Sequence, residues 1–332
     1  MIHLDESDLG TLRNTVSGIA TNLSEAPYTD LVRRAAAEGL LGAIVPEGSG
    51  GLDLDAPSAA VIVSSFAEVL LTDGIVEALI AARMFAHTMP EFAPALVEGR
   101  AFATAHLPRI LPQLSNGKLS GEVLHVPFGA EVDYLVTLAN DGNREVVIIV
   151  EMTAPGVSWR VAPGLDLERP HAHVILGKVQ PASVSLEDGA AKEMRFWLAA
   201  LRTVWFSTNI RKILAETVAH LTTREQFGKP LVTLPVLRQT LAEQQLLVEN
   251  LGLLSEDALQ RCELGAALTA LEYAVRTGPG VAEKCLHLFG GMGFTWEMPM
   301  HRYLRRIRMM ADTNYAAADR LATLDPLNAV TV

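Results

Sequence analysis

Two short segments hold the residues best suited to chemistry, one beginning at Arg224 and the other at Gly290. Arg224 is a permanent planar cation that can pair bidentately with a phosphate, and Phe227 offers an aromatic face three residues later. Gly290, Gly291 and Gly293 remove three side chains from four positions, which permits a tight turn and a close approach of backbone to a ligand. Together the segments suit a nucleotide pyrophosphate.

Each segment taken singly also fits an ordinary turn at a helix end. Gly228 is expected to stop a helix, because a residue without Cβ adopts the left-handed conformation at low cost. Pro230, two residues later, cannot continue a helix. We therefore expect Arg224 to lie near the C-terminus of a helix.

The elements that must position these segments are mostly helical. Helical periodicity marks residues 6–98, with amphipathic stretches at 31–41 and 59–71 around a glycine-rich loop at 48–51. Residues 101–186 instead carry β-branched runs at 134–139 and 145–151, with turn signals at 116–117 and 140–143, which predicts antiparallel strands. Long helical patterns then return at 196–222, 235–252, 255–276, 280–289 and 300–322.

This organisation predicts an α+β protein that is mainly α with a small β domain. The expected domains are an all-α domain at 1–100, an antiparallel β domain at 101–190 and a four-helix bundle at 191–332.

Composition narrows the class of protein. The chain has 332 residues, 49% of them hydrophobic, and a formal net charge of −11, which argues against a nucleic-acid groove. The arginine run of 302, 305, 306 and 308 is expected to be an interface or a solvated helix face. Cys262 and Cys285 have no metal-ligand or disulfide-framework spacing, and no apolar run reaches membrane-spanning length. An acidic N-terminus and these features predict a cytoplasmic protein outside the membrane.

The two segments resemble the signatures of the acyl-CoA dehydrogenase family. The family carries an Arg-x-x-Phe-Gly-Lys turn and, about sixty residues later, a Gly-Gly-x-Gly-Phe-Thr-x-Glu-x-Pro run. A third resemblance is the loop at 38–52 with its Pro-Glu and Gly-Gly pairs. The matching residues of the first two motifs are Arg224, Phe227, Gly228 and Lys229, then Gly290, Gly291, Gly293, Phe294, Thr295, Glu297 and Pro299.

The resemblance implies an FAD-binding oxidoreductase that desaturates an acyl-CoA, with electron-transferring flavoprotein as the acceptor. In the family a glutamate removes the α-proton while the β-hydride passes to the flavin. His287 replaces the family's usual glutamine and can still donate a hydrogen bond. The implied cofactor-binding residues are Arg224, Gln226, Phe227, His287, Gly290 and Gly291.

The catalytic base departs from the family pattern. Counting from Pro299, the expected glutamate position falls on Asn314, which cannot accept the proton. Asp312 lies two residues earlier, and Glu216 lies on the helix from which other members supply the base, although the gapless count places Val218 at that position. Asp312 and Glu216 are therefore the candidate bases, with solvated helix charge as the alternative for each.

The expected flavin-facing residues are also absent. The family's Trp and Thr positions fall on His125 and Pro127, and proline has no donor for the flavin ring. The family's Thr-Glu-x-x-(Gly/Ala)-Gly-Ser-Asp loop is missing from residues 105–112. The pattern keeps the residues that reach a neighbouring subunit's FAD and loses those that serve the chain's own flavin and substrate.

The chain therefore resembles the shortened, base-lacking partner in heteromeric α2β2 members of the family from actinobacteria. The resemblance implies a second, catalytically equipped chain as partner, an acyl-CoA substrate derived from a steroid side chain or ring, as in cholesterol degradation, and a shortened β domain. Two alternatives stay open. One is a self-sufficient homotetramer with Asp312 or Glu216 as base, and the other is a noncatalytic scaffold subunit.

Overall fold

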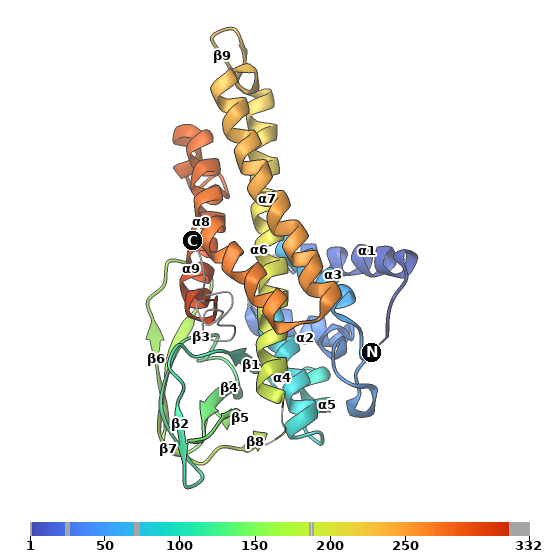
Figure 1. Cartoon of the computed structure of the whole chain (residues 1–332), viewed down its shortest axis with the longest axis vertical. Coiled ribbons are helices and arrows are strands. Elements are labelled where there is room, and N and C mark those ends of the chain that lie inside the picture. The colour runs from blue at the N-terminus through green and yellow to red at the C-terminus, as the bar shows by residue number, and fades with distance from the viewer. Residues whose placement is uncertain (1, 24–26, 70–73, 186, 188, 319–332) are drawn as a thin grey trace. The chain divides into compact units, whose positions relative to one another are not determined.

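The computed structural model describes residues 2–23, 27–69, 74–185, 187 and 189–318. The ends of two expected helices, residues 70–71 and 319–322, lie outside these ranges. The chain divides into two compact units, Met1–Leu201 and Arg202–Val332 (Figure 1). The α+β class with mainly helical content is confirmed, while the division into three domains at residues 100 and 190 stays a prediction.

The first unit begins with helices whose ends are set by capping side chains. Asp5 accepts a hydrogen bond from the backbone N–H of Asp8, and Asp55 does the same for Ser58, so each satisfies a donor that its helix leaves open. The loop at 38–52 contains two 3₁₀ turns, Leu40–Gly42 and Glu47–Ser49. The helices are α1 (Glu6–Asn22), α2 (Tyr28–Ala37), α3 (Ala56–Ala67), α4 (Ile75–Thr88) and α5 (Ala93–Val97).

A mixed eight-stranded sheet follows in the same unit. The strand order is β6-β7-β3-β2-β4-β5-β8, with β1 also paired to β4. Most pairs are antiparallel, as expected, including β4 with β5, while β4 also pairs in parallel with β1 and with β2. The strands are β1 (Ala103–His106), β2 (Gln113–Ser115), β3 (Lys118–Pro127), β4 (Tyr134–Asn140), β5 (Glu145–Glu151), β6 (Val157–Ala162), β7 (His171–Val179) and β8 (Ser183–Ser185).

The central strands are covered on both faces. β4 and β5 are each buried at five consecutive positions, which is typical of strands without a solvated face. Phe85 of α4 packs edge-to-face on Tyr134 of β4, with ring centroids 5.3 Å apart. Helix α4 is thereby fixed against the sheet.

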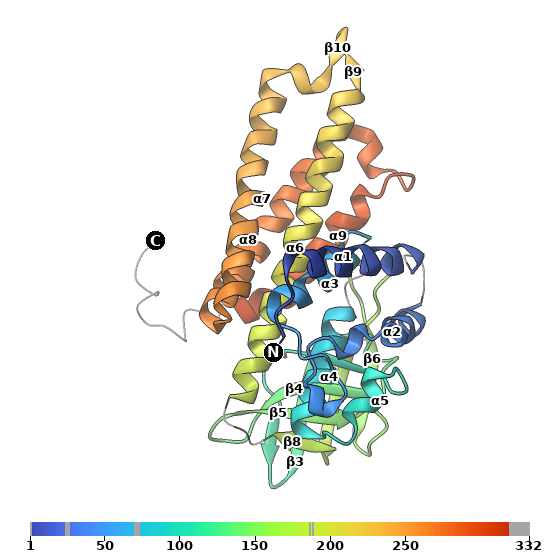
Figure 2. The same cartoon turned by 90° about the vertical axis from the view of Figure 1, so that its right-hand side faces the viewer.

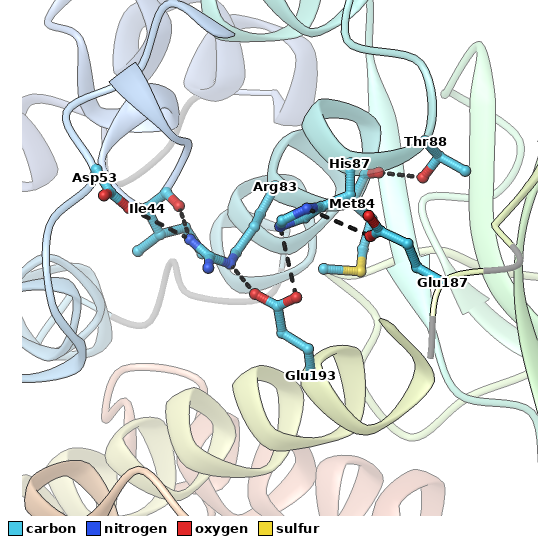
Figure 3. A network of polar contacts seen from close by, with 8 residues as sticks. All are labelled: Ile44, Asp53, Arg83, Met84, His87, Thr88, Glu187 and Glu193. Atoms are coloured by element: carbon cyan, nitrogen blue, oxygen red, sulfur yellow. Dashed lines mark hydrogen bonds and ion pairs between the residues drawn. The ribbon is translucent and has the colours of Figure 1, made fainter. Parts of the chain in front are cut away.

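A polar network crosses the first unit at α4 (Figure 3). The Arg83 guanidinium, which is largely buried, donates to Glu193 Oε1 at 2.5 Å and to the carbonyl of Ile44. His87, one turn along α4, places Nε2 3.5 Å from Glu193 Oε2. Asp53 adds a carboxylate 3.9 Å from Arg83. The network joins the segment between α2 and α3, helix α4 and the first turn of α6.

We expect this network to make stability depend on pH. Burial opposes ionisation of Glu193, but His87 and Arg83 outweigh it and lower its pKa from 4.5 to about 2. The Glu193 contact chiefly raises the pKa of His87 above 6.5. Glu193 therefore stabilises the fold above pH 4.5 and loses this contribution as pH falls toward 2. His87 contributes fully below pH 6.5 and loses its contribution as pH rises through its raised pKa.

The measurement is the urea midpoint of wild type and of Glu193→Gln across pH. The difference between them should be largest between pH 4.5 and 6.5 and shrink on both sides. A difference that is constant with pH would contradict the linkage.

The second unit is a helical bundle. Figures 1 and 2 show α6 and α7 running side by side, joined at one end by β9 and β10. Among the described residues no helix is both long and apolar enough to span a membrane. The bundle helices are α6 (Ala190–Thr223), which starts in the first unit, α7 (Pro235–Arg261), α8 (Leu264–Leu288) and α9 (Met300–Ala318). The four-helix expectation is confirmed.

The expected breaks inside α7 and α8 were wrong. Helix α7 continues through Gly252 and ends at Arg261, and the next residue, Cys262, takes the left-handed conformation at φ 52°. Helix α8 continues through Pro279. A Cβ at Gly252 would lie 2.9 Å from the guanidinium of Arg211 on α6, so this glycine leaves space for the end of that flexible side chain.

Candidate functional site

Arg224 directly follows the C-terminus of α6, as expected, but the helix ends at Thr223 and not at Gly228. The next residues form a small hairpin of β9 (Glu225–Gln226) and β10 (Lys229–Pro230). Phe227 and Gly228 make its two-residue turn with φ values of 56° and 75°. Positive φ at both central residues is the geometry of a type I′ hairpin turn, and this explains the glycine.

The hairpin presents its functional groups to the outside. Arg224 is exposed, and it forms no ion pair with any residue that the structure describes. The Phe227 side chain is 86% exposed, and Gln226 is exposed on β9. A cation and an aromatic ring are thus both open to a ligand or a second protein.

The glycine segment forms a 3₁₀ turn, Gly290–Phe294, at the end of α8. Gly290 has φ 64°, and a Cβ on Gly290 or Gly291 would meet nothing within 4 Å. A Cβ on Gly293 would lie 2.8 Å from the carbonyl oxygen of Leu286. Gly293 is therefore needed for packing on α8, whereas Gly290 and Gly291 leave backbone open to an approaching group.

Side-chain contacts bring the two segments together. His220, in the last turn of α6, stacks on Phe289 just before the glycine turn, with centroids 4.3 Å apart and planes at 15°. One turn further back, Thr217 forms a hydrogen bond with the thiol of Cys285, whose pKa burial raises to about 11. Arg224 and Gly290 directly follow these contacts in the chain, so they lie at the same end of α6 and α8.

The remaining predicted binding residue lies beside this end. His287 occupies the last turn of α8, is exposed, and has its ring 6.3 Å from that of Phe294. Arg224, Gln226 and His287 thus offer donors, and Gly290 and Gly291 offer open backbone. Such a donor set suits a diphosphate, which accepts hydrogen bonds at several oxygens.

The two candidate bases are exposed residues on helix surfaces. Glu216 is exposed on α6 and pairs with Lys212 at 3.3 Å, one turn away. Asp312 is exposed on α9. Asn314, at the position of the family glutamate, is 1% exposed, and its Oδ1 accepts a hydrogen bond from the buried Arg202 at 2.6 Å. Nothing in the sequence pattern indicated this pair.

The arginine run on α9 does not form one surface. Arg306 is buried, Arg308 pairs with Glu283, and the Arg305 guanidinium lies over the ring of Trp296 at 5.2 Å. Only part of the run is therefore available as the interface or solvated face that was expected.

His125 lies in the β sheet, at a bulge of β3 opposite β7. It has φ 54°, and its backbone N–H donates to Nδ1 of His173 at 3.2 Å. Burial, followed by the His125 charge, lowers the pKa of His173. Pro127 ends β3. The two positions that differ from the family's flavin-facing pair thus belong to an irregular strand held by a histidine contact.

Comparisons with known proteins identify a matching sequence model and related sequences. The sequence model described as acyl-CoA dehydrogenase, C-terminal domain, matches residues 194–312. The acyl-CoA dehydrogenase FadE28 of Mycobacterium tuberculosis is 27% identical over 197 residues, which cover 58% of this chain. The chain spans only 57% of the length of that relative.

Two solved structures share the fold over nearly the whole chain. A steroid ACAD variant, Tcur3481-Tcur3483, has a TM-score of 0.87 at 22% identity and covers 98% of this chain and 99% of its own. The ChsE4-ChsE5 complex from Mycobacterium tuberculosis has a TM-score of 0.86 at 21% identity, covering 99% of each chain. These likenesses show the shared fold. Residues 194–312 match the C-terminal domain of the acyl-CoA dehydrogenase family, whose members are oxidoreductases that bind FAD.

Proposed function

We propose that this chain is one subunit of a heteromeric, FAD-dependent acyl-CoA dehydrogenase that introduces an α,β double bond into an acyl-CoA. Its part is to hold the diphosphate end of FAD at a subunit boundary, while a second chain supplies the catalytic glutamate. The observation that carries the proposal is that the exposed Arg224 cation and the open backbone of Gly290 and Gly291 follow the same end of α6 and α8, where His220 stacks on Phe289. Bound FAD would accept the hydride, which no residue of this chain can do.

The site residues have separate roles in this proposal. The Arg224 guanidinium pairs with a phosphate, and its planar fork allows two parallel hydrogen bonds. Gly290 and Gly291 let the phosphate or ribose approach the main chain, because no Cβ intervenes. Gln226 and His287 donate hydrogen bonds at the edges of the site, and Phe227 covers it with an apolar ring.

Exposed apolar side chains on the same two segments favour a second protein chain. Phe227 is 86%, Trp296 78% and Phe294 60% exposed. Aromatic residues and arginine are enriched among the side chains that dominate protein–protein binding, and Arg305 lies against Trp296. A cofactor bound only from this side would keep its other side in water, whereas a partner chain would enclose it.

The proposed substrate and subunit assembly rest on analogy with the structural neighbours. A steroid-derived acyl-CoA is proposed because one structural neighbour is a steroid ACAD, and an α2β2 assembly because another is a two-protein complex. Electron-transferring flavoprotein is the proposed electron acceptor. The two free cysteines agree with a cytoplasmic location.

We expect the chain purified alone to be colourless and inactive, and the chain co-expressed with a catalytically equipped partner to be yellow. The measurements are the visible absorption spectrum and the native mass of both preparations. A yellow, active homo-oligomer of this chain alone would overturn the proposal. It would favour the self-sufficient enzyme and make Asp312 and Glu216 the residues to substitute.

A further inference from the structure

The stacked pair of His220 and Phe289 lies between the two halves of the proposed cofactor site. The imidazole is the last aromatic side chain of α6, and the phenyl ring precedes the glycine turn. With centroids 4.3 Å apart and planes at 15°, the rings are nearly parallel and overlap. One face of the imidazole is thus covered, and the ring orientation is fixed by α8.

Arg224 is the charged group that most directly affects His220. Its backbone N–H donates to the His220 carbonyl at 2.8 Å, so the two residues are held one helical turn apart. Partial burial, and then the charge of Arg224, lowers the pKa of His220. The imidazole is consequently neutral at neutral pH while the site holds no anion.

Other titratable groups near the stacked pair do not offset the effect of the Arg224 charge on the pKa of His220. Glu216, one turn earlier on α6, is paired with Lys212 at 3.3 Å. Cys285 on α8 stays a protonated thiol because burial raises its pKa. The neighbouring charged or titratable residues on the elements around the stack are Glu216 on α6, Arg224 directly after it, Glu225 and Lys229 on the hairpin, and Lys284, Cys285 and His287 on α8.

A diphosphate on Arg224 would reverse the electrostatic balance at His220. Two negative charges would cancel the guanidinium field and place an anion close to the imidazole. An opposite charge within about 4–6 Å commonly raises the pKa of a histidine by one unit or more. The protonated ring could then donate a hydrogen bond toward the anion, while its stack on Phe289 is kept.

We propose that His220 is a proton-accepting residue of the cofactor site, which takes one proton from solvent when the diphosphate of a dinucleotide binds Arg224. This inference rests on the proposed function. His220 is a positioning and charge-compensating residue and not a participant in the redox step. Binding of the cofactor would thereby be linked to pH through this chain alone.

The test is isothermal titration of ADP-ribose into the flavin-free complex of this chain with its catalytically equipped partner, in two buffers of different ionisation enthalpy. ADP-ribose carries the adenosine diphosphate half of FAD, and its doubly esterified diphosphate keeps its charge between about pH 6 and pH 8. We expect an uptake of up to one proton per ligand and binding about five- to tenfold tighter at pH 6 than at pH 8.

Three variants separate the possible roles. His220→Phe keeps a ring on Phe289 but cannot titrate, and it should remove the proton uptake and the pH dependence. His3→Gln removes an exposed imidazole of the first unit and should keep both. If uptake survives His220→Phe, or is lost with His3→Gln, this inference is overturned. If ADP-ribose does not bind, or binds equally well to Arg224→Ala, the proposed cofactor site fails as well.

Discussion

Replacing Arg224 by alanine is expected to strip most of the FAD from the assembled complex. Arg224 is exposed and has no ion pair within the part of the chain that the structure describes, so its charge is available to the cofactor. Loss of one partner of a desolvated, charge-assisted pair costs about 2–5 kcal/mol, or roughly 30- to several-thousand-fold in affinity. The measurement is the ratio of flavin to protein after gel filtration, together with dehydrogenase activity when FAD is added back.

Two further variants make this result specific. Arg224→Lys keeps the charge but loses the planar fork, so it should fall between wild type and Arg224→Ala. Arg261→Ala removes another exposed arginine, at the far end of α7, where it pairs with Glu263 at 2.6 Å, and should leave the flavin content unchanged. Full flavin content in an assembled Arg224→Ala complex would instead favour the noncatalytic scaffold.

Replacing Arg83 by methionine should destabilise the first unit by about 3–5 kcal/mol. The substitution leaves Glu193, which is ionised and partly buried, without its closest cation, and removes the donor to the Ile44 carbonyl. It also removes the guanidinium that lies 5.2 Å over the ring of Trp197. Urea denaturation followed by circular dichroism measures the effect as a lower midpoint.

The matching surface variant is Arg34→Met. Arg34 pairs with Glu38 at 3.0 Å on α2, but its side chain is 59% exposed, so the loss should be below about 1 kcal/mol. The double variant Arg83→Met/Glu193→Leu should recover much of the stability, because it removes the carboxylate together with its closest cation. Equal losses for Arg83→Met and Arg34→Met would show that the network contributes no more than a surface pair.

Helices and strands could be predicted from the sequence where the residue pattern has only one structural explanation. The β-branched runs and turn signals located β4 and β5, because buried strands of an α+β fold need continuous apolar residues. Glycine and proline did not locate the helix ends reliably, since each can end a helix or lie inside one where a neighbouring side chain packs closely. Gly252 lies inside α7 beside Arg211, and Gly278, which precedes Pro279, lies against Phe206 of α6. Only the three-dimensional neighbours distinguish the two uses.

The candidate site was predictable in its residues but not in its geometry. The motif spacing identified Arg224 and the glycine turn, and the structure places both at one end of α6 and α8. The hairpin at Phe227 and Gly228 was mistaken for a helix stop, because positive φ is shared by both structures. The His220–Phe289 stack could not be foreseen, since it depends on the register between two helices.

The hydrogen bond between Arg202 and Asn314 limits how this chain could be converted into a complete enzyme. Position 314 is enclosed, and a guanidinium lies 2.6 Å from its side-chain oxygen. A glutamate introduced there would meet a buried cation, which stabilises the ionised carboxylate and lowers its proton affinity. A weakly basic carboxylate is a poor acceptor for an α-proton. Restoring the family's glutamate by a single substitution would therefore add a buried ion pair to the bundle and not a catalytic base.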